Sequence, residues 1–352
     1  MAGQLHAYRY INAKLRTRIG KLLDYSFFRS LAGVGSLDTA VSRLAEQGLT
    51  EVAQAYRDTG DVRVCEQRLY HREIGILLEV ERYLDGSRRD FVAMLGDRYE
   101  IENVKTALRL WFESVRRGKH VESKINYLSR EVVHRDIDLD GIVNAASAED
   151  IPVVLEGTPY AAPVARNLES IQRTGSLFFT ERALDYDYFE RMLELARDLP
   201  KPDREPALRS VALEADRENV SWIMRAINYY GLDEKDALAS ILPGGTVFDE
   251  KTLREAVRSG RSTAVLLDRL GRSSTAGVSR EGGRHARGIA LIEAALDEET
   301  YNLAHRYLGT YPFTMGVVLA YYMLTRRQIR RIMAVLNGLY YGLDAETMEA
   351  AL

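Results

Sequence analysis

The stretch "ENVKTALR" at Glu102–Arg109 returns as "ENVSWIMR" at Glu218–Arg225, 116 positions further along the chain. Glu, Asn, Val and Arg occupy the same places in both copies, and the apolar residues recur at the spacing of one helix face. A weaker third copy, "RRIMAVLN" at Arg330–Asn337, follows 112 positions later and keeps the apolar residues Ile332 and Leu336. The stretch therefore predicts a helix that the chain uses more than once.

Two further features recur in the same order. A helix start, "ERALDYDYF" at Glu181–Phe189, matches "EAALDEETY" at Glu293–Tyr301 closely and "EQRLYHREI" at Glu66–Ile74 more loosely. A turn of small residues that leads into a helix occurs at Gly35–Leu44, Ala146–Leu155 and Val257–Leu266. Three features in one order, 111 to 116 positions apart, predict one helical unit that is repeated three times.

Apolar residues at helical spacing run through almost the whole chain, whereas the alternation typical of β-strands is nearly absent. We therefore predict an all-α protein with an N-terminal helix around Tyr8–Leu23. The three repeats are predicted at residues 1–118, which include that helix, 119–242 and 243–352. Because each repeat has the size of a domain, we expect a pseudo-threefold body and not a thin superhelix of short repeats.

Clusters of Gly and Pro predict breaks between the helices. One break lies at Leu199–Pro206, and the longest lies at Gly271–Gly288, where we expect a mobile loop. The charged residues of that loop are one acid and four arginines, namely Glu281, Arg272, Arg280, Arg284 and Arg287. The loop is therefore either a solvated linker or a surface for an acidic partner or lipid headgroups.

The composition indicates an ordinary soluble globular protein, with 46% hydrophobic and 28% charged residues. A formal net charge of -3 provides no overall attraction to nucleic acid, so we expect no nucleic-acid partner. One cysteine, Cys65, is too few for an intramolecular disulfide or a zinc site. The first residues contain no apolar signal core, and we expect a cytoplasmic protein.

The segment Tyr307–Arg331 raises the question of a membrane span, because it has no charge before Arg326. Pro312 interrupts it, and a helix from about Phe313 would offer only about eleven apolar-rich residues before Thr325, too few to cross a bilayer at 1.5 Å per residue. The segment also aligns with an amphipathic part of the second repeat. We therefore predict a buried helix and no transmembrane segment.

The segment "DIDLDG" at Asp136–Gly141 fits the first six positions of a calcium loop. Position twelve, which should be a bidentate glutamate, is Ser147. The pattern favours a capped helix start over a calcium site.

The sequence predicts no catalytic, cofactor-binding or metal-binding residues. The histidines lack metal-ligand spacing and are expected on the surface or in the core: His6, His71, His120, His134, His285 and His305. Phosphate-binding and nucleophile motifs are also missing. Asp185 and Asp187 could form an acidic catalytic pair, but their place at a helix start favours a role in capping or dipole stabilisation.

The repeated polar residues are the candidates for contacts between repeats or with partner proteins, because active sites are rarely copied whole in each repeat. On a helix, Glu102 and Arg109 share a face and Asn103 lies beside Glu102. The alternative is a helix cap with an exposed arginine. The candidates in the other two copies are Glu218, Asn219 and Arg225, and Arg327, Arg331 and Asn337.

The chain resembles the C subunit of archaeal and bacterial V/A-type ATPases, which is equivalent to the d subunit of the eukaryotic V-type ATPase. The resemblance covers nearly the whole chain and is carried by Tyr8–Leu23, Leu155–Tyr160, the paired "ENV" helices and Tyr311–Met333. It implies three similar helical domains in a pseudo-threefold funnel. It further implies a non-catalytic central-stalk component that couples the central shaft to the membrane rotor ring of proteolipid subunits for proton or sodium transport.

The resemblance also implies a peripheral protein on the cytoplasmic face of the membrane. Two hypotheses of other classes remain open. The first is a free-standing helical repeat scaffold for soluble protein partners, which the repeats alone would allow. The second is an all-α enzyme that uses Asp136, Asp138 and Asp140.

Overall fold

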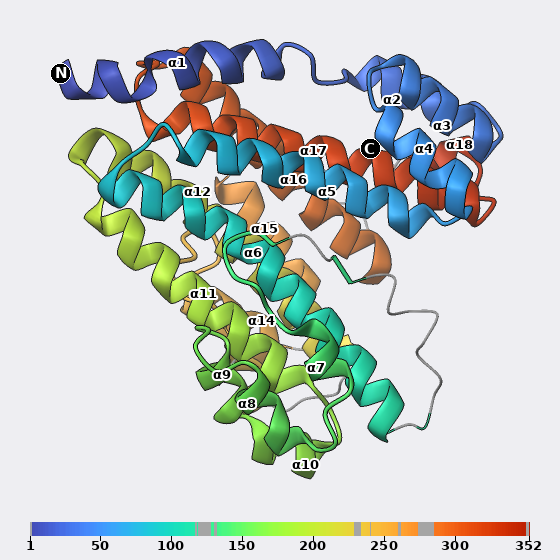
Figure 1. Ribbon diagram of the computed structural model, residues 1–352, viewed down its shortest axis with the longest axis vertical. Helices are drawn as coiled ribbons and strands as arrows, with labels where there is room; N and C mark the ends of the chain where they lie inside the picture. Colours follow the sequence, from blue (N-terminus) through green and yellow to red (C-terminus); the bar gives the residue numbers. More distant parts are fainter. Residues whose placement is uncertain are drawn as a thin grey trace. The chain divides into compact units, whose positions relative to one another are not determined.

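The computed structural model describes residues 2–116, 118, 128–129, 132–228, 234–239, 241–259, 262–273, 285–349 and 352 (Figure 1). Within these residues the regular structure is helical, with no β-strand, and the all-α prediction is confirmed. The chain divides into two compact units, which we call unit 1 (Met1–Leu84 with Thr300–Leu352) and unit 2 (Asp85–Glu299).

Three pairs of consecutive long helices stand out along the chain. The pairs are α5 (Val62–Glu81) with α6 (Gly86–Trp111), α11 (Phe178–Asp198) with α12 (Lys201–Asn228), and α16 (His285–Gly309) with α17 (Met315–Tyr340). The repeated stretch that was predicted as a helix start lies in the first helix of each pair, and the repeated "ENV" stretch or its weaker copy lies in the second. The predicted start is wrong for α16, because this helix already begins at His285, eight residues before Glu293. The division into three repeats at 1–118, 119–242 and 243–352 stays a prediction.

Unit 1 is built on α17, along which α1 (Ala2–Ile19) and α5 pack. The short helices α2 (Tyr25–Ala32) and α3 (Leu37–Glu46) also contact α17, and α4 (Thr50–Thr59) contacts α5. The last short helix, α18 (Ala345–Glu349), contacts α2. Side chains fix two of the helix starts: Asp24 accepts a hydrogen bond from the amide of Phe27 at 2.8 Å, and Ser36 accepts one from Thr39 at 3.2 Å.

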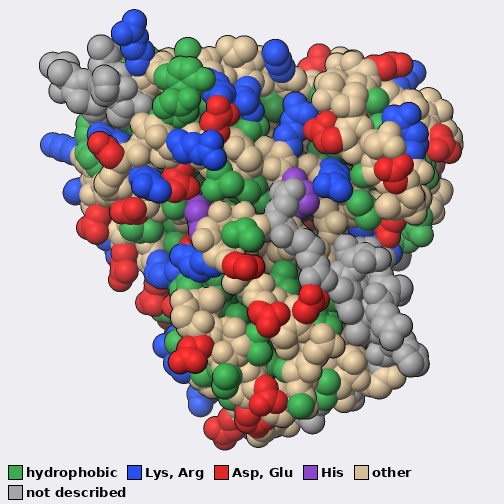
Figure 2. All heavy atoms as spheres, viewed as in Figure 1, with side chains coloured by type: hydrophobic (Ala, Val, Ile, Leu, Met, Phe, Trp, Pro, Cys, Tyr) green, Lys and Arg blue, Asp and Glu red, His purple; other side chains and the backbone are tan. Residues whose placement is uncertain are grey.

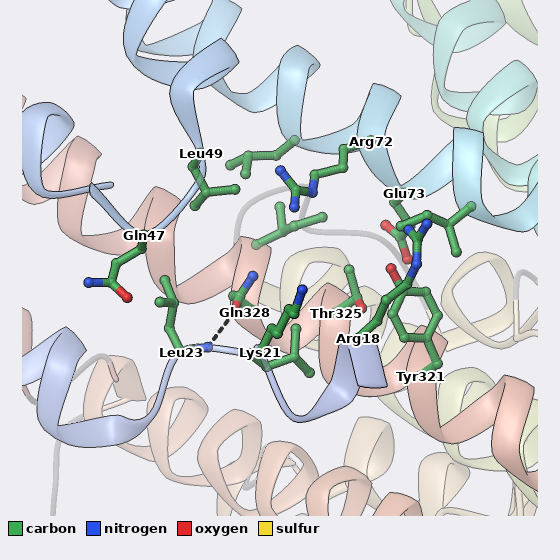
Figure 3. Close-up of a pocket in the computed structure, with 14 residues that line it drawn as sticks. Arg18, Lys21, Leu23, Gln47, Leu49, Arg72, Glu73, Tyr321, Thr325 and Gln328 are labelled. Atoms are coloured by element: carbon green, nitrogen blue, oxygen red, sulfur yellow. Dashed lines mark hydrogen bonds between the residues drawn. The ribbon is translucent and has the colours of Figure 1, made fainter. Parts of the chain in front are cut away.

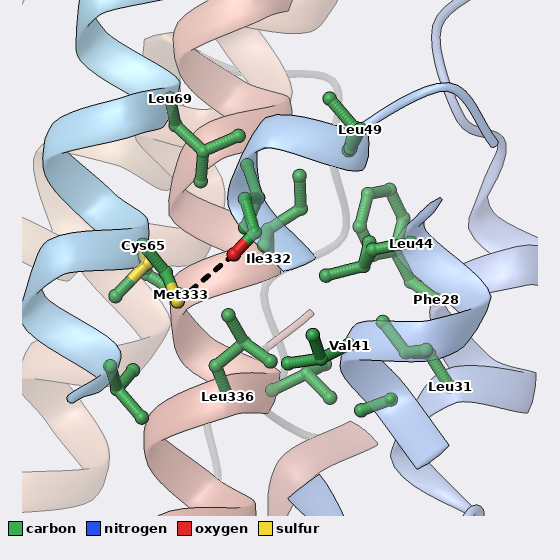
Figure 4. Close-up of a cluster of buried hydrophobic side chains, with 14 of the residues drawn as sticks. Phe28, Leu31, Val41, Leu44, Leu49, Cys65, Leu69, Ile332, Met333 and Leu336 are labelled. Carbon is green, nitrogen blue, oxygen red and sulfur yellow. Dashed lines mark hydrogen bonds between the residues drawn. The ribbon is translucent and has the colours of Figure 1, made fainter. Parts of the chain in front are cut away.

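The core of unit 1 is formed by side chains of α2, α3, α4 and α5 together with side chains of the C-terminal half of α17 (Figure 4). Phe28, Leu44 and Leu336 are fully buried there. Cys65 lies in the same cluster, and its thiol donates to the carbonyl oxygen of Val52 at 3.7 Å. Burial raises the pKa of Cys65 to about 11, so this cysteine is a neutral core residue at physiological pH.

The N-terminal half of α17, Met315–Thr325, is buried. The helix starts at Met315, two residues after the predicted Phe313, because the hydroxyl of Thr314 accepts a hydrogen bond from the amide of Gly316 and caps it. Among the described residues, no helix, α17 included, has the length and apolar character needed to cross a bilayer.

Unit 2 is built on α6, α11 and α12. The short helices α7 (Leu139–Val143), α8 (Ile151–Val154), α9 (Ala161–Ala165) and α10 (Leu168–Thr174) follow α6, whose end continues as one π-helical turn at Phe112–Arg116. Of these, α7 packs on α6, and α9 and α10 pack on α11. The helices α13 (Glu234–Ala239), α14 (Glu250–Arg258) and α15 (Ser262–Ser273) pack on α12.

Three further predicted boundaries are wrong. The N-terminal helix begins at Ala2 and ends at Ile19, before the predicted Leu23. The predicted break at Leu199–Pro206 is confined to its first two residues, because α12 starts at Lys201. Pro206 lies inside this helix near its beginning, where its missing N–H costs the helix one backbone hydrogen bond. The ends of the predicted loop, residues 271–273 and 285–288, are helical, and its residues 274–284 lie outside the described part of the chain.

The face in Figure 2 carries basic and acidic side chains together, with apolar side chains between them. This mixture agrees with the small net charge of -3. Neither sign dominates among the side chains that this view shows.

Replacing Leu44 with Ala should lower the free energy of unfolding of unit 1 by about 2–5 kcal/mol, because the change leaves a cavity in a closed core. The matched control is Leu343→Ala in the same unit, where the leucine is 48% exposed and the expected loss is under about 0.5 kcal/mol. Urea denaturation followed by circular dichroism measures both. Equal losses for the two variants would contradict this assignment of the core.

Candidate functional site

Glu218, one of the predicted contact residues, lies on α12 and pairs with Arg98 of α6 at 2.8 Å. The same guanidinium pairs with Glu214 at 2.7 Å, and its side chain is only 14% exposed. Burial alone would raise the pKa of Glu218, but the charge and hydrogen bond of Arg98 outweigh it and hold the pKa at about 2. Arg98 therefore ties α6 to two successive turns of α12.

Lys105 makes the corresponding connection between α6 and α11. Its ammonium donates to Glu102 at 3.1 Å and also to Asp185 of α11. Asp187, the other half of the possible acidic pair, is held instead by Arg191 at 2.8 Å. Each of the two aspartates therefore has its own cation, which does not favour a catalytic dyad. Their predicted place at a helix start is wrong, because both aspartates lie about two turns or more inside α11.

Arg109, at the end of the repeated stretch, contacts the start of α11. Its Nε and Nη2 atoms donate to the two carboxylate oxygens of Glu181 at 2.7 and 2.8 Å. This bidentate geometry fixes the direction of both side chains as well as their distance. Arg225, at the same place in the second copy, is exposed.

The repeated asparagines bind backbone. The amide of Asn103 donates to the carbonyl of Ser129 at 2.8 Å and accepts from the N–H of the same residue at 2.9 Å. Asn219 makes the same pair of bonds with Leu242, at 2.9 and 2.7 Å. A side-chain amide has one donor and one acceptor side, so it can satisfy both polar groups of a residue in a connecting segment.

In the third copy the predicted residues lie in unit 1 and behave differently. The guanidinium of Arg327 lies over the ring of Tyr301, 4.4 Å from its centroid. Arg331, which stands where the other copies have asparagine, lies over the ring of Tyr25 at 5.6 Å. Asn337 is exposed near the end of α17. This copy uses cation–π contacts where the other two bind backbone.

A second set of repeated contacts was missed at the sequence level. Glu100, three residues before Asn103, accepts backbone N–H bonds from His134 and Arg135 at 2.7 and 2.8 Å. Asp216, three residues before Asn219, accepts three such bonds, at 2.8 to 3.0 Å, from Thr246, Val247 and Phe248.

Gln328, three residues before Arg331, completes the set by accepting the backbone N–H of Leu23 at 2.7 Å. We call Glu100, Asp216 and Gln328 the anchor residues. Each one binds backbone just before a short helix that an aspartate caps, namely Asp24, Asp138 and Asp249. The sequence signal that could have revealed this set is a polar residue three positions before the repeated asparagine, or before the residue that replaces it in the third copy.

Glu100 also belongs to a cluster in which Asp97, Glu100 and His134 bring possible metal-ligand atoms close together. Arg135 occupies the same cluster and donates to Asp97 at 2.9 Å and to Glu100 at 2.8 Å. The hydroxyl of Tyr160 donates to Glu100 at 2.7 Å. Because Arg135 already supplies a positive charge to these carboxylates, the arrangement favours a structural network over a metal site.

The segment Asp136–Gly141 forms a capped helix start, as the sequence favoured. Oδ1 of Asp138 accepts the N–H of Gly141 at 2.7 Å, and α7 begins at the next residue, Leu139. The carboxylate of Asp138 is thus committed to the helix cap, which weakens both the calcium and the enzyme hypotheses.

Residues 11–351, nearly the whole chain, match the sequence model of the ATP synthase (C/AC39) subunit family. The chain belongs to this family. The resemblance that the repeats and the end segments carry is thereby confirmed.

Relatives in this family extend along almost the whole chain. The C subunit of the A-type ATP synthase from Haloferax volcanii is 26% identical over 356 residues, covering 97% of this chain and 96% of its own length. The protein of the same name from Thermococcus kodakarensis is 23% identical over 348 residues, covering 97% and 89%. That from Halorubrum lacusprofundi is 23% identical over 350 residues, covering 97% and 96%.

Asp216→Ala should lower the free energy of unfolding of unit 2 by about 3 kcal/mol, because three N–H groups lose a buried acceptor. Asp216→Asn keeps one acceptor oxygen and should fall between the wild type and Asp216→Ala. Both tryptophans, Trp111 and Trp222, lie in unit 2, so fluorescence during urea denaturation reports on it. The control is Asp187→Ala, which removes a partly exposed ion pair and should cost under about 1 kcal/mol. A loss for Asp216→Ala no larger than the control's would contradict the anchoring role.

The low pKa of Glu218 predicts a pH-dependent contribution to stability. Its pKa lies below the ordinary value of 4.5 in the folded state, so the contribution is present above that value and disappears as the pH falls toward about 2. The stability difference between the wild type and Glu218→Gln should therefore be largest near neutral pH and shrink below about pH 4. The same fluorescence measurement at several pH values tests this. A difference that stays constant down to the lowest pH would refute it.

Proposed function

We propose that this chain is a non-catalytic central-stalk component of a rotary V/A-type ATPase. In this role it couples the central shaft to the membrane rotor ring for proton or sodium transport. The family match over residues 11–351 is the observation that carries the proposal, together with relatives named as the C subunit of A-type ATP synthases. The chain would be peripheral to the membrane, on its cytoplasmic face.

The repeated contacts support a funnel of three similar helical domains. Three pairs of long helices recur along the chain, and the second helix of each pair carries one anchor residue at the same place. In each case the anchored segment leads into a short helix with an aspartate cap. Contacts that recur in one order and at one spacing are expected of a structural unit used three times.

The ion pairs between the helices of unit 2 suit a part that transmits torque. Arg98, Lys105 and Arg109 of α6 each pair with an acid of α11 or α12. Two of these cations are largely buried, with side-chain exposures of 14% and 6%. Pairs of this kind resist sliding of one helix along another, because moving either charge leaves its partner buried without compensation.

The predicted contact residues divide into three groups under this proposal. Arg327 and Arg331 lie over aromatic rings within unit 1. Glu102, Asn103, Arg109, Glu218 and Asn219 bind within unit 2 and would give the protein its stiffness. Arg225 and Asn337 are exposed and are the better candidates for contacts with the ring or the shaft.

Purification of the tagged chain from native membranes tests the proposal. We expect the proteolipid ring and the shaft subunits to co-purify with it, and the isolated chain to hydrolyse no ATP. Recovery of soluble proteins without ring or shaft would overturn the proposal and favour the free-standing scaffold. ATP hydrolysis by the isolated chain, retained through a second purification step, would contradict the non-catalytic role.

A further inference from the structure

A five-residue motif, "YYGLD", occurs twice in the chain, at residues 229–233 and 340–344. The two copies lie 111 positions apart, which is the spacing of the other repeated features. The first copy lies outside the described residues, and α13 begins directly after it. The second copy begins with the last residue of α17, and α18 begins directly after it. The motif therefore marks the step from a long helix to a short one in two of the repeats.

The end of α17 explains two of the five motif residues. Gly342 has a φ of +69°, in the left-handed region that ends many helices and that glycine adopts without strain. Oδ1 of Asp344 accepts the N–H of Thr347 at 2.7 Å and caps the start of α18. The turn itself thus requires the glycine and the aspartate, and it requires no aromatic residue.

The two tyrosines and the leucine of the motif point to another role. Tyr341 is 74% exposed, Tyr340 is 59% exposed and Leu343 is 48% exposed, and we call these three residues the aromatic tip. The two tyrosine rings stand edge to face with their centroids 5.1 Å apart. Asn337, an exposed contact candidate, lies one turn earlier on the same face of α17. Exposed apolar side chains that recur in an identical motif indicate a surface that another molecule covers.

The charges at this end of unit 1 are mainly acidic. Residues 24–69 and 332–352, which supply most of the core in Figure 4, contain ten acids and five arginines. Asp344 and Glu346 lie nearest to the aromatic tip in the sequence, and within the described part of the chain neither forms an ion pair. This end of the unit therefore attracts a cationic partner and repels an anionic one.

The neighbouring helices add to this acidic character. Partial burial raises the pKa of Tyr56 on α4, and the charges of Asp38 and Tyr340 contribute to that rise. Asp38, an exposed acid of α3, therefore lies near the aromatic tip. The closest arginine of α2, Arg29, is already paired with Glu349 at 3.2 Å.

The polar residues earlier on α17 are occupied inside unit 1. Gln328 accepts the backbone N–H of Leu23 (Figure 3). Arg331, the last arginine of the helix, lies over the ring of Tyr25 and stands nine positions, about 14 Å, before Tyr340. Among the described residues no lysine or arginine lies over either tyrosine ring of the aromatic tip, so both ring faces are open to a cation from outside.

Tyrosine ring faces attract Lys and Arg side chains, and exposed carboxylates add to the attraction. We propose that the aromatic tip and the acids beside it, Asp344 and Glu346, bind a basic segment of a partner protein. Lys or Arg side chains of that segment would lie against the two tyrosine rings, and its apolar groups would cover Leu343. An anionic lipid headgroup would meet acids of its own sign, so the charges favour a basic protein segment.

This inference rests on the proposed function, because it takes the partner to be another component of the ATPase. The test uses the assembled complex with the photoreactive residue p-benzoylphenylalanine in place of Tyr341, which on illumination joins to whatever covers it. We expect a cross-link to another protein of the complex, in a segment with a positive net charge that mass spectrometry identifies.

Two variants of the same complex separate the charge from the rings. Glu346→Lys should lower the yield of that cross-link at least about fivefold, the effect of about 1 kcal/mol, because an attraction becomes a repulsion. Its control is Glu205→Lys, the same change at a 72% exposed acid of α12, which should leave the yield unchanged. Tyr340→Ala should lower the yield about twofold to fivefold, whereas Tyr340→Phe keeps the ring face and should preserve it.

A complex that assembles but gives no cross-link from position 341 to another of its proteins would overturn the inference and leave the proposed function standing. A cross-link to lipid or to an acidic segment, or one that Glu346→Lys does not weaken, would overturn it too. Failure of the chain to assemble with ring and shaft would remove the proposed function, and this inference with it.

The isolated full chain shows whether the tyrosines serve the fold instead. The double variant Tyr340→Ala with Tyr341→Ala should keep Tm within about 2 °C of the wild type, because both side chains are exposed. The control is the core variant Leu44→Ala, which should lower Tm clearly. A loss of Tm in the double variant as large as that of Leu44→Ala would give the tyrosines a structural role and contradict the inference.

Discussion

The structure depends on one kind of contact: a side chain on a long helix accepts backbone N–H groups from the segment that precedes a capped short helix. A segment between helices has no regular partner for its N–H groups, and burying them unpaired would cost about 1–3 kcal/mol each. Asp216 meets this need for three consecutive residues. Glu100 and Gln328 meet it elsewhere, so each of these short helices is fixed by a long helix.

These contacts link the repeat in the sequence to the mechanical role that we propose. In unit 2 a long helix anchors the backbone through its acid and asparagine positions and binds neighbouring long helices through its basic residues. The repeated asparagines therefore serve as hydrogen-bond partners for backbone N–H and C=O groups in the connecting segments. The third copy departs from this pattern, since Arg331 stacks on aromatic rings and Gln328 is neutral.

The helical class and the long helices could be predicted because apolar spacing is a local signal that does not depend on distant residues. The polar contacts could be predicted only as a set of candidates. Asn103 was singled out because it is repeated, but its partner Ser129 carries no repeated signal. Arg98 was missed because the second copy has Glu214 at that place, which is its ion-pair partner. The anchor residues were missed because Glu, Asp and Gln share a function as acceptors but not an identity.

The central claim is that this protein stands between a rotor ring and a shaft. Electron cryomicroscopy of the intact native complex tests it most directly, because the chain would be recognised by its three pairs of long helices. The account predicts density for the chain on the axis of the complex, in contact with the ring on one side and the foot of the shaft on the other. Density at the periphery of the complex, away from both, would contradict it.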